Sequence, residues 1–381
     1  MVRSRITTNL RGHPETLRGL PRDNGSMTVT KTSVSPALRR AMDSYESGAG
    51  FLAVASIGIP TTQTVAAQKR DLDLWAAAER DPQDYDAIIE RTRGHYARLV
   101  GVTPDRVATS AQTSVIASLV AAGVPKGKEV LCIDGDFSSI MFPFLQRAGI
   151  RVRTASLDDF ADAITDDTWL AVFSLIQSSS GIVADIPAIL AAAEAHNTYT
   201  FCDVTQAAGV HPVDASLFDV TACHTYKWLG CPRGVAFMTL SERFDPLLTP
   251  LNAGWYAGDD VWQSCYGPTM DLARDARRFD VSPAWPAWVG AEPAIEMFAN
   301  LDIAEVWAYT SGLGDMLCDE LGIPQQHQAI VTWADPERTD LRKLIDAGIR
   351  ASGRAGRLRA SFHIWNDESD VAAVVAALRA E

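Results

Sequence analysis

The sequence lacks long hydrophobic segments, paired-cysteine motifs and an excess of basic residues, and each absence excludes a class of protein. No apolar run reaches the roughly 18 residues that a bilayer-spanning helix requires, and the first 26 residues lack the apolar core of a secretion signal. The 34 basic residues are outnumbered by 47 acidic ones, which gives a formal net charge of −13. This balance argues against nucleic acid or an anionic membrane as the main partner. We therefore expect a cytoplasmic protein.

The cysteines show no CxxC pair and no Cys/His spacing of a metal site. Most of the six lie in apolar runs, so we expect reduced, buried core residues and no bound metal. They are Cys132, Cys202, Cys223, Cys231, Cys265 and Cys318.

Changes of pattern along the 381 residues divide the chain into four segments. Residues 1–26 are polar and arginine-rich, which predicts a flexible tail. Residues 27–45 are expected to form an N-terminal segment that packs with the C-terminal domain. Residues 46–284 are expected to form a large domain, and residues 285–381, with two helical patterns followed by short strands, a smaller α+β domain.

Short apolar runs alternate with helical patterns from about residue 105. The runs that read as strands are RVATS (106–110), EVLCIDGD (129–136), IRVRTASL (150–157), TWLAVFSLIQ (168–177), TYTFCDV (198–204), DVTACHT (219–225) and GVAFMTL (234–240). Nearly continuous apolar strands separated by helices indicate an α/β protein with a mainly parallel sheet that is covered on both faces. Ligands of such sheets bind beyond the carboxyl ends of the strands, where the chemistry is therefore expected.

Two charged residues follow neighbouring strands at that edge. Asp203 ends the strand at 198–204, and Lys227 lies just after the strand at 219–225, in an aromatic setting. Each has a simpler interpretation, because most lysines lie at the surface and an aspartate after a strand often caps a turn.

Together these residues meet the needs of one cofactor, pyridoxal 5'-phosphate. Its aldehyde requires a lysine, supplied by Lys227, and its ring nitrogen requires a carboxylate, supplied by Asp203. The segment AQTS at 111–114 opens a helix whose N–H groups and hydroxyls suit a phosphate. Phe137 offers an aromatic face for the cofactor ring.

From about residue 27 onward the sequence resembles the class V aminotransferase family of fold type I pyridoxal phosphate enzymes. This family includes cysteine desulfurases, kynureninases and isopenicillin epimerase-like proteins. The resemblance is carried by CDVTQAAG (202–209), DVTACHTYKWLGCPRGVAFM (219–238) and RLRASFHIWND (357–367). It implies a large domain with a seven-stranded, mainly parallel sheet and a smaller α+β domain.

The resemblance also implies roles for individual residues. Lys227 corresponds to the catalytic Schiff-base lysine, Asp203 to the partner of the pyridine nitrogen and Phe137 to the stacking ring. The residues implied near the ring hydroxyl are Gln206 and Ser178, and those implied near the phosphate are Gln112, Thr113, His224 and Tyr226. Arg359 corresponds to the group that binds the substrate carboxylate, a task suited to a guanidinium; a surface arginine is the alternative interpretation.

Two further segments bear on the substrate. NAGWYAG (252–258) resembles a loop that reaches into the neighbouring subunit's site, which implies a homodimer with shared active sites. Trp255 and Tyr256 would then line the substrate pocket, or would contact only the interface. Thr30 lies where many relatives carry a substrate loop.

The type of reaction follows only from the resemblance. RDARRFDVSPAWPAWVGAEPAIE (274–296) is most similar to the branch of carbon-sulfur lyases and isopenicillin epimerase-like proteins. We therefore expect a β-lyase that cleaves a cysteine S-conjugate in the biosynthesis of a sulfur-containing natural product. No cysteine follows Cys318, so the nucleophile of a cysteine desulfurase is missing from its expected place. An aminotransferase or decarboxylating deaminase acting on a related amino acid remains an alternative, as does a catalytically silent binding subunit.

Overall fold

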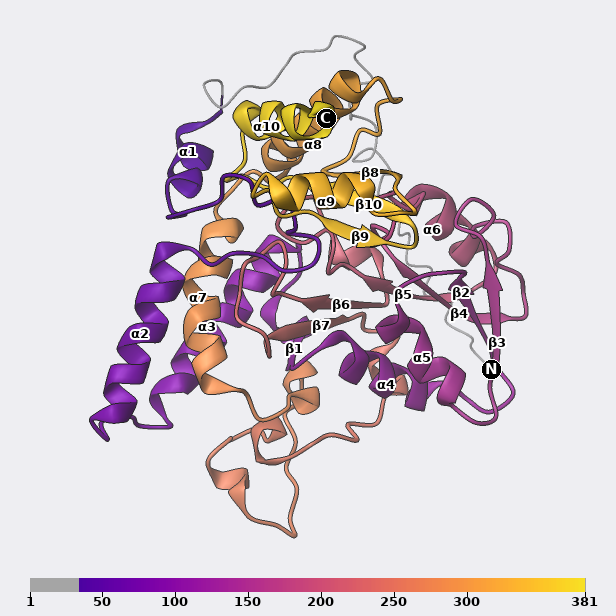
Figure 1. Cartoon of the computed structure of the whole chain (residues 1–381). Helices are drawn as coiled ribbons and strands as arrows, with labels where there is room; N and C mark the ends of the chain where they lie inside the picture. The colour runs from indigo at the N-terminus through magenta and orange to yellow at the C-terminus, as the bar shows by residue number, and fades with distance from the viewer. Residues whose placement is uncertain (1–33, 381) are drawn as a thin grey trace.

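Two β-sheets of different size organise the protein (Figure 1). The structure is a computed structural model that describes residues 34–380, so the predicted tail and Thr30 lie outside the described residues. The strands of the larger sheet are β1 (Val107–Ser110), β2 (Glu129–Ile133), β3 (Arg151–Ala155), β4 (Thr168–Ser174), β5 (Tyr199–Asp203), β6 (Val220–His224) and β7 (Ala236–Leu240). The strands of the smaller sheet are β8 (Ile330–Ala334), β9 (Ser352–Arg354) and β10 (Arg357–Ser361).

The larger sheet is mainly parallel, as predicted. Its strands have the order β1-β7-β6-β5-β4-β2-β3, and only β7 runs antiparallel to its neighbours. The carboxyl ends of β5 and β6 are therefore adjacent, with Asp203 paired to Ala222 in the register. This topology brings the segments after the two strands to one edge.

Helices cover both faces of the larger sheet (Figure 1). The α-helices are α1 (Pro36–Met42), α2 (Thr62–Ala76), α3 (Asp84–Leu99), α4 (Thr113–Gly123), α5 (Ser138–Gln146), α6 (Ile186–Ala195), α7 (Trp285–Ala299), α8 (Ile303–Leu321), α9 (Thr339–Asp346) and α10 (Glu368–Arg379). One hydrophobic core packs α4 and α5 against the sheet, and a second packs α3, α6 and α7 against the opposite face. Burial on both faces explains why the strands other than the exposed edge strand β3 are nearly continuously apolar.

Short 3₁₀ turns connect these elements. They are η1 (Pro104–Arg106), η2 (Ala215–Leu217), η3 (Asp245–Leu247), η4 (Trp255–Ala257), η5 (Gln263–Cys265) and η6 (Ala276–Phe279). Among the described residues, no helix is both long and apolar enough to cross a membrane. All six cysteines are free, and five of them are buried, in agreement with the prediction for core residues.

The smaller sheet lies above the carboxyl edge of the larger one, with α8, α9 and α10 packed around it (Figure 1). The N-terminal helix α1 joins this part of the protein, since Ser35 donates its N–H and hydroxyl to Glu305 at the start of α8. The segment before α2 also reaches it, through hydrogen bonds from the Leu52 N–H to the Arg350 carbonyl and from the Ser361 N–H to the Leu52 carbonyl. Residues distant in sequence therefore meet between the two sheets.

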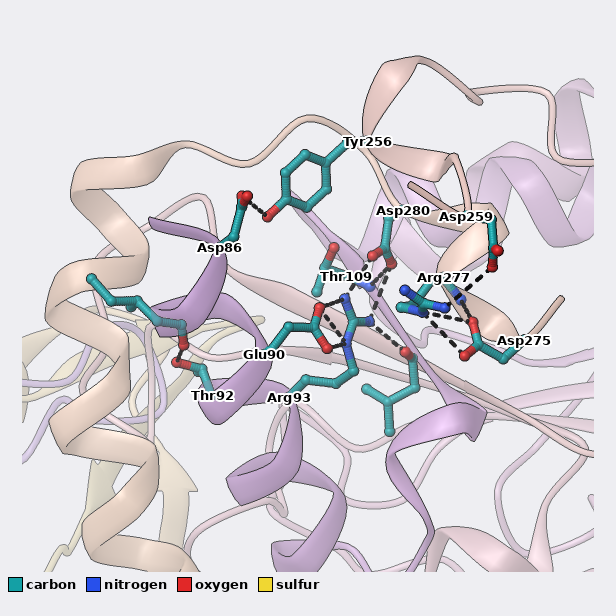
Figure 2. A network of polar contacts seen from close by, with 12 residues as sticks. Asp86, Glu90, Thr92, Arg93, Thr109, Tyr256, Asp259, Asp275, Arg277 and Asp280 are labelled. Atoms are coloured by element: carbon teal, nitrogen blue, oxygen red, sulfur yellow. Dashed lines mark hydrogen bonds and ion pairs between the residues drawn. The ribbon is translucent and has the colours of Figure 1, made fainter. Parts of the chain in front are cut away.

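A buried ion pair fixes the start of the larger sheet (Figure 2). Nη2 of Arg93, in α3, lies 2.6 Å from Oδ2 of Asp280, and both side chains are 1% exposed. Asp280 also accepts the N–H of Thr109, and Arg93 donates to the carbonyl of Val107, each at 2.6 Å. The pair thus holds β1, which leads directly to the segment 111–114.

We expect Asp280→Asn to lower the free energy of unfolding by about 3–5 kcal/mol, because it leaves the buried charge of Arg93 without its closest partner. The control is Glu292→Gln, which breaks the pair with Arg91, whose side chain is 55% exposed. That variant should lower the free energy of unfolding by less than about 1 kcal/mol. Urea unfolding measures both values, and equal losses would contradict the role given to the buried pair.

Candidate active site

Lys227 carries a buried amine. It lies in the turn after β6, its side chain is 6% exposed, and Nζ has no hydrogen-bond or ion-pair partner among the described residues. The amine lies 5.4 Å from the ring centroid of Phe137 and 5.7 Å from that of Tyr226. Burial lowers the pKa of Lys227 to about 8, although the charge of Asp203 opposes this shift. Much more of the amine is therefore unprotonated near neutral pH than in an exposed lysine.

Asp203 is a buried carboxylate whose charge acts on this amine. It ends β5, is 4% exposed and accepts the N–H of Thr205 at 2.8 Å. Burial raises the pKa of Asp203 to about 6, while the hydrogen bonds from Thr205 and the charge of Lys227 act in the opposite direction. A cationic N–H placed beside it would favour the ionised form.

The hydroxyl of Thr205 connects two parts of the site. It accepts the N–H of His224 at 2.9 Å and lies 3.5 Å from the hydroxyl of Thr113, the first residue of α4. Gln112 is the exposed, extended N-cap of α4, and its side chain makes no capping bond. The N–H groups of Thr113 and Ser114 therefore remain available for an anion, whereas those of Val115 and Ile116 donate to the carbonyl of Gln112. Thr205 was not among the predicted site residues, although it lies between Asp203 and Gln206.

His224 and Tyr226 form an aromatic group beside α4. Their rings meet edge to face at 4.4 Å, and the guanidinium of Arg233 lies 4.3 Å from the centroid of the Tyr226 ring. Nε2 of His224 is buried and has no hydrogen-bond partner among the described residues. Burial, together with the charges of Arg233 and Lys227, lowers the pKa of His224 to about 4. The neutral imidazole is thus free to donate one hydrogen bond to a ligand.

Phe137 presents a partly exposed ring toward Lys227. Phe137 is the N-cap residue of α5, and 39% of its surface is exposed. The buried carboxylate of Asp136 accepts the N–H of Phe137 at 2.6 Å and the N–H and hydroxyl of Ser174 at 2.8 and 2.6 Å. Asp136 was missed by the sequence analysis, and it ties the Phe137 turn to the end of β4.

Arg359 is a buried guanidinium that has only neutral partners. It is 2% exposed and donates to the hydroxyls of Ser352 and Ser56, at 3.0 and 2.7 Å, and to the carbonyl of Ser178. No carboxylate among the described residues forms an ion pair with it. Burial lowers the pKa of Arg359 to about 10, yet the group stays cationic at neutral pH. An uncompensated buried cation is suited to binding a carboxylate.

The segment before α2 closes over the turn that carries Lys227. The N–H of Gly58 donates to the carbonyl of Tyr226 at 2.9 Å, and the same segment contributes Ser56 to Arg359. A Cβ atom on Gly58 would lie 2.0 Å from the carbonyl oxygen of Lys227, so glycine is required for this close approach. The backbone around Lys227 is therefore held from both sides.

Four predicted residues make no described contact with Lys227. Gln206 and Ser178 lie in this region, whereas Trp255 and Tyr256 lie away from it. The amide of Gln206 donates to Ala55 O and accepts from Trp228 Nε1, and Ser178 contributes its carbonyl to Arg359. Trp255 and Tyr256 belong to η4, in the segment between β7 and α7. Part of this segment projects below the larger sheet, on the far side from the smaller sheet (Figure 1), and Figure 2 shows the ring of Tyr256 pointing toward Asp86. The Tyr256 hydroxyl donates to Asp86 there. The functional roles of these four residues, like those of the other predicted site residues, stay predictions.

The described residues fit pyridoxal phosphate. Lys227 supplies an unpaired amine and Asp203 a carboxylate, while Phe137 supplies an aromatic face. The unpartnered Nε2 of His224 and the open N-terminus of α4 supply donors for a phosphate.

Comparison with known proteins supports this interpretation. The sequence profile "Aminotransferase class-V" matches residues 77–341. The chain belongs to the class V aminotransferase family. This membership confirms the predicted family, a pyridoxal phosphate-dependent enzyme, and its cofactor.

Individual relatives of this family member are distant. The uncharacterized aminotransferase YcbU of Bacillus subtilis is 28% identical over 242 residues, which cover 58% of this chain and 63% of that protein. Kynureninase of Deinococcus radiodurans is 28% identical over 254 residues, covering 63% and 61%. These two matches span less than two thirds of each relative's length. Isopenicillin N epimerase of Streptomyces clavuligerus is 24% identical over 344 residues, covering 76% and 85%.

Solved structures confirm the predicted fold class. The cystine C-S lyase C-DES, in complex with its product cysteine persulfide, superposes with a TM-score of 0.78 at 20% identity and covers 87% of this chain and 97% of that chain. The cysteine desulfurase CsdA of Escherichia coli superposes with a TM-score of 0.76 at 18% identity, with coverage of 90% and 97%. At these identities the likeness concerns the fold alone.

Proposed function

We propose that the protein is a pyridoxal phosphate-dependent β-lyase that cleaves the carbon-sulfur bond of a cysteine S-conjugate. The observation that carries the proposal is that the described residues place a buried amine, Lys227, and a guanidinium without an ion-pair partner, Arg359, in a site with no exposed thiol. Cys318 is fully buried in α8, and Cys223 is 1% exposed. The partly exposed Cys265 lies in η5, on the segment that carries Trp255, and has no described contact with Lys227 or Arg359 of its own chain. Within one subunit, such a site can therefore expel sulfur with the leaving group but offers no accessible cysteine to accept it.

The residues would divide the work as follows. Arg359 binds the α-carboxylate and Phe137 stacks on the cofactor ring, while Asp203 holds the proton on the ring nitrogen. When bound, pyridoxal phosphate withdraws electrons from the substrate's α-carbon. Nζ of Lys227 takes the α-proton as a general base, and the thiolate leaves from the β-carbon. With one water consumed, the products are a thiol, pyruvate and ammonium.

The site is proposed to be completed by a second subunit. Trp255 and Tyr256 lie together on the projecting segment, with ring centroids 5.2 Å apart, and contact neither Lys227 nor Arg359 of their own chain among the described contacts. In a homodimer with shared sites, this segment would reach the partner's substrate pocket.

Product analysis tests the proposal. S-substituted cysteines incubated with the cofactor-loaded protein should release equal amounts of thiol and pyruvate. A keto acid that retains the sulfur substituent would instead indicate an aminotransferase, and carbon dioxide would indicate a decarboxylating deaminase. A protein that takes up no cofactor would support a silent binding subunit.

The lowered pKa of Lys227 predicts the pH dependence of cofactor uptake. Only the unprotonated amine attacks the aldehyde, so the rate at which the apoprotein is loaded should rise with pH and level off above about 8. An ordinary lysine would still gain rate up to its pKa of about 10.4. Visible absorbance followed after mixing apoprotein with the cofactor gives the rate, and an apparent pKa near 10 would contradict the buried environment of Lys227.

A further inference from the structure

A second arginine lies next to Arg359 at the same hydroxyl. Ser56 Oγ accepts Nη2 of Arg359 at 2.7 Å and Nη2 of Arg354 at 3.4 Å. Arg354 also donates to the carbonyl of Gly353 at 2.8 Å, and no carboxylate among the described residues pairs with it. A neutral hydroxyl cannot offset two cations. This position therefore holds an excess of positive charge beside the predicted carboxylate site.

The β9–β10 hairpin places both arginines there. Arg354 closes β9 opposite Arg357 in the antiparallel register, and Ser352, two residues before Arg354, is paired with Arg359. The two turn residues, Ala355 and Gly356, have φ values of 49° and 72°. Positive φ at both central residues is the conformation of a tight hairpin turn, and alanine adopts it only at some cost. The position of Arg354 is thus set by the backbone of a short, tight hairpin.

The charge of Arg354 reaches the site electrostatically. Arg354 adds to the effect of burial in lowering the pKa of Arg359, and it also contributes to the lowered pKa of Lys227. The two arginines differ in depth, since Arg359 is 2% exposed whereas Arg354 is exposed at the hairpin tip. Arg359 is suited to the inner carboxylate, and Arg354 to a group farther out on the same ligand.

We propose that Arg354 binds a second anionic group of the substrate, so that the enzyme selects cysteine S-conjugates whose sulfur substituent ends in a carboxylate or a similar anion. The inference rests on the proposed function in one respect: Arg359 takes the α-carboxylate. Two arginines without acidic partners then match a substrate with two negative groups, and a guanidinium binds such a group through paired hydrogen bonds.

Two pairs of probes test this selection, because each pair differs in charge but hardly in shape. They are S-carboxymethylcysteine with S-carbamoylmethylcysteine, and S-(2-carboxyethyl)cysteine with S-(2-carbamoylethyl)cysteine. We expect the cofactor-loaded enzyme to prefer the acid over the amide of at least one pair by tenfold or more in kcat/KM for thiol release. Arg354→Gln should remove most of this preference, mainly through KM of the acid, and should leave kcat/KM of the amide within twofold.

The matched control is Arg357→Gln. Arg357 lies opposite Arg354 on the same hairpin, but its guanidinium donates to Thr332 instead of Ser56. The control should keep the preference for the acid. Arg354→Glu should reverse the preference. Equal losses on acid and amide in Arg354→Gln would show that Arg354 serves only the α-carboxylate and would overturn the inference, as would a wild type that does not discriminate in either pair.

A binding measurement separates this inference from the proposed function. If none of the four probes releases thiol, the lyase proposal fails, and the same probes are titrated against the visible absorbance of the bound cofactor. Tighter binding of an acid than of its amide, lost in Arg354→Gln, would still support the second anion site. Equal binding of both members of each pair would overturn it.

Discussion

Lys227→Ala is expected to abolish the visible absorbance of the purified protein and to lower lyase activity by at least about 1,000-fold. The variant removes both the amine that holds the cofactor and the general base at the α-carbon, and each contribution alone is large. Spectra of protein dialysed against excess cofactor, together with pyruvate release, give the two values. A variant that keeps its absorbance would contradict the role of Lys227.

Two control variants sharpen this result. Lys227→Arg keeps a positive charge near Asp203 but offers no amine that can react with an aldehyde, so it should fail in the same way. Lys343→Ala should behave as wild type, because the amine of Lys343 donates to the carbonyls of Leu378 and Ala380, on the C-terminal helix α10 and just after it. Lost absorbance in Lys227→Arg together with normal Lys343→Ala would assign the effect to the chemistry of one amine.

The larger sheet was predictable because its strands carry a strong local signal. Six of them are short, mostly apolar runs bounded by turns or helical patterns, the polar edge strand β3 being the exception, and the structure contains a strand within each of the seven runs. Helix α2 was not predicted, because its sequence TQTVAAQKRDLDLWA is largely polar and buries only Thr64 and Asp71. Its N-cap Thr61, which accepts the N–H of Thr64 at 3.1 Å, was the available signal. Strand β9 is three residues long and contains a glycine, which leaves little pattern to detect.

The candidate site was predictable only for residues whose chemical type, together with their place after a strand, indicates a cofactor. Lys227 and Asp203 follow neighbouring strands, so topology alone brings them to one edge. Ser56 could not be found this way, because its contact with Arg359 joins residues 303 positions apart. Asp136 directly precedes Phe137 and looks like an ordinary turn residue, yet its carboxylate joins two strand ends. Contacts of this kind depend on how loops pack, which local patterns do not encode.

Asp203→Asn should separate catalysis from cofactor binding, because it keeps the side chain's size and removes its charge. We expect the variant to retain visible absorbance through Lys227 but to lose about 100- to 1,000-fold in kcat, since an amide cannot hold the ring proton electrostatically. The control is Asp219→Asn. Asp219 lies just before β6, at its amino end, and pairs with Arg243. Loss of this buried carboxylate should reduce stability and leave kcat nearly unchanged.

The same variant tests the raised pKa of Asp203 in the apoprotein. Because the folded-state pKa is raised from 3.8 to about 6, the folded protein holds this proton more tightly than the unfolded chain. The resulting stabilisation is full below pH 4 and is lost as pH rises through about 6, a change of about 3 kcal/mol. Asp203→Asn cannot titrate at this position. Between pH 4 and 7 the free energy of unfolding of the wild type should therefore fall by this amount relative to that of the variant. Parallel pH profiles for the two proteins would show that Asp203 titrates normally and that its burial does not favour the protonated form.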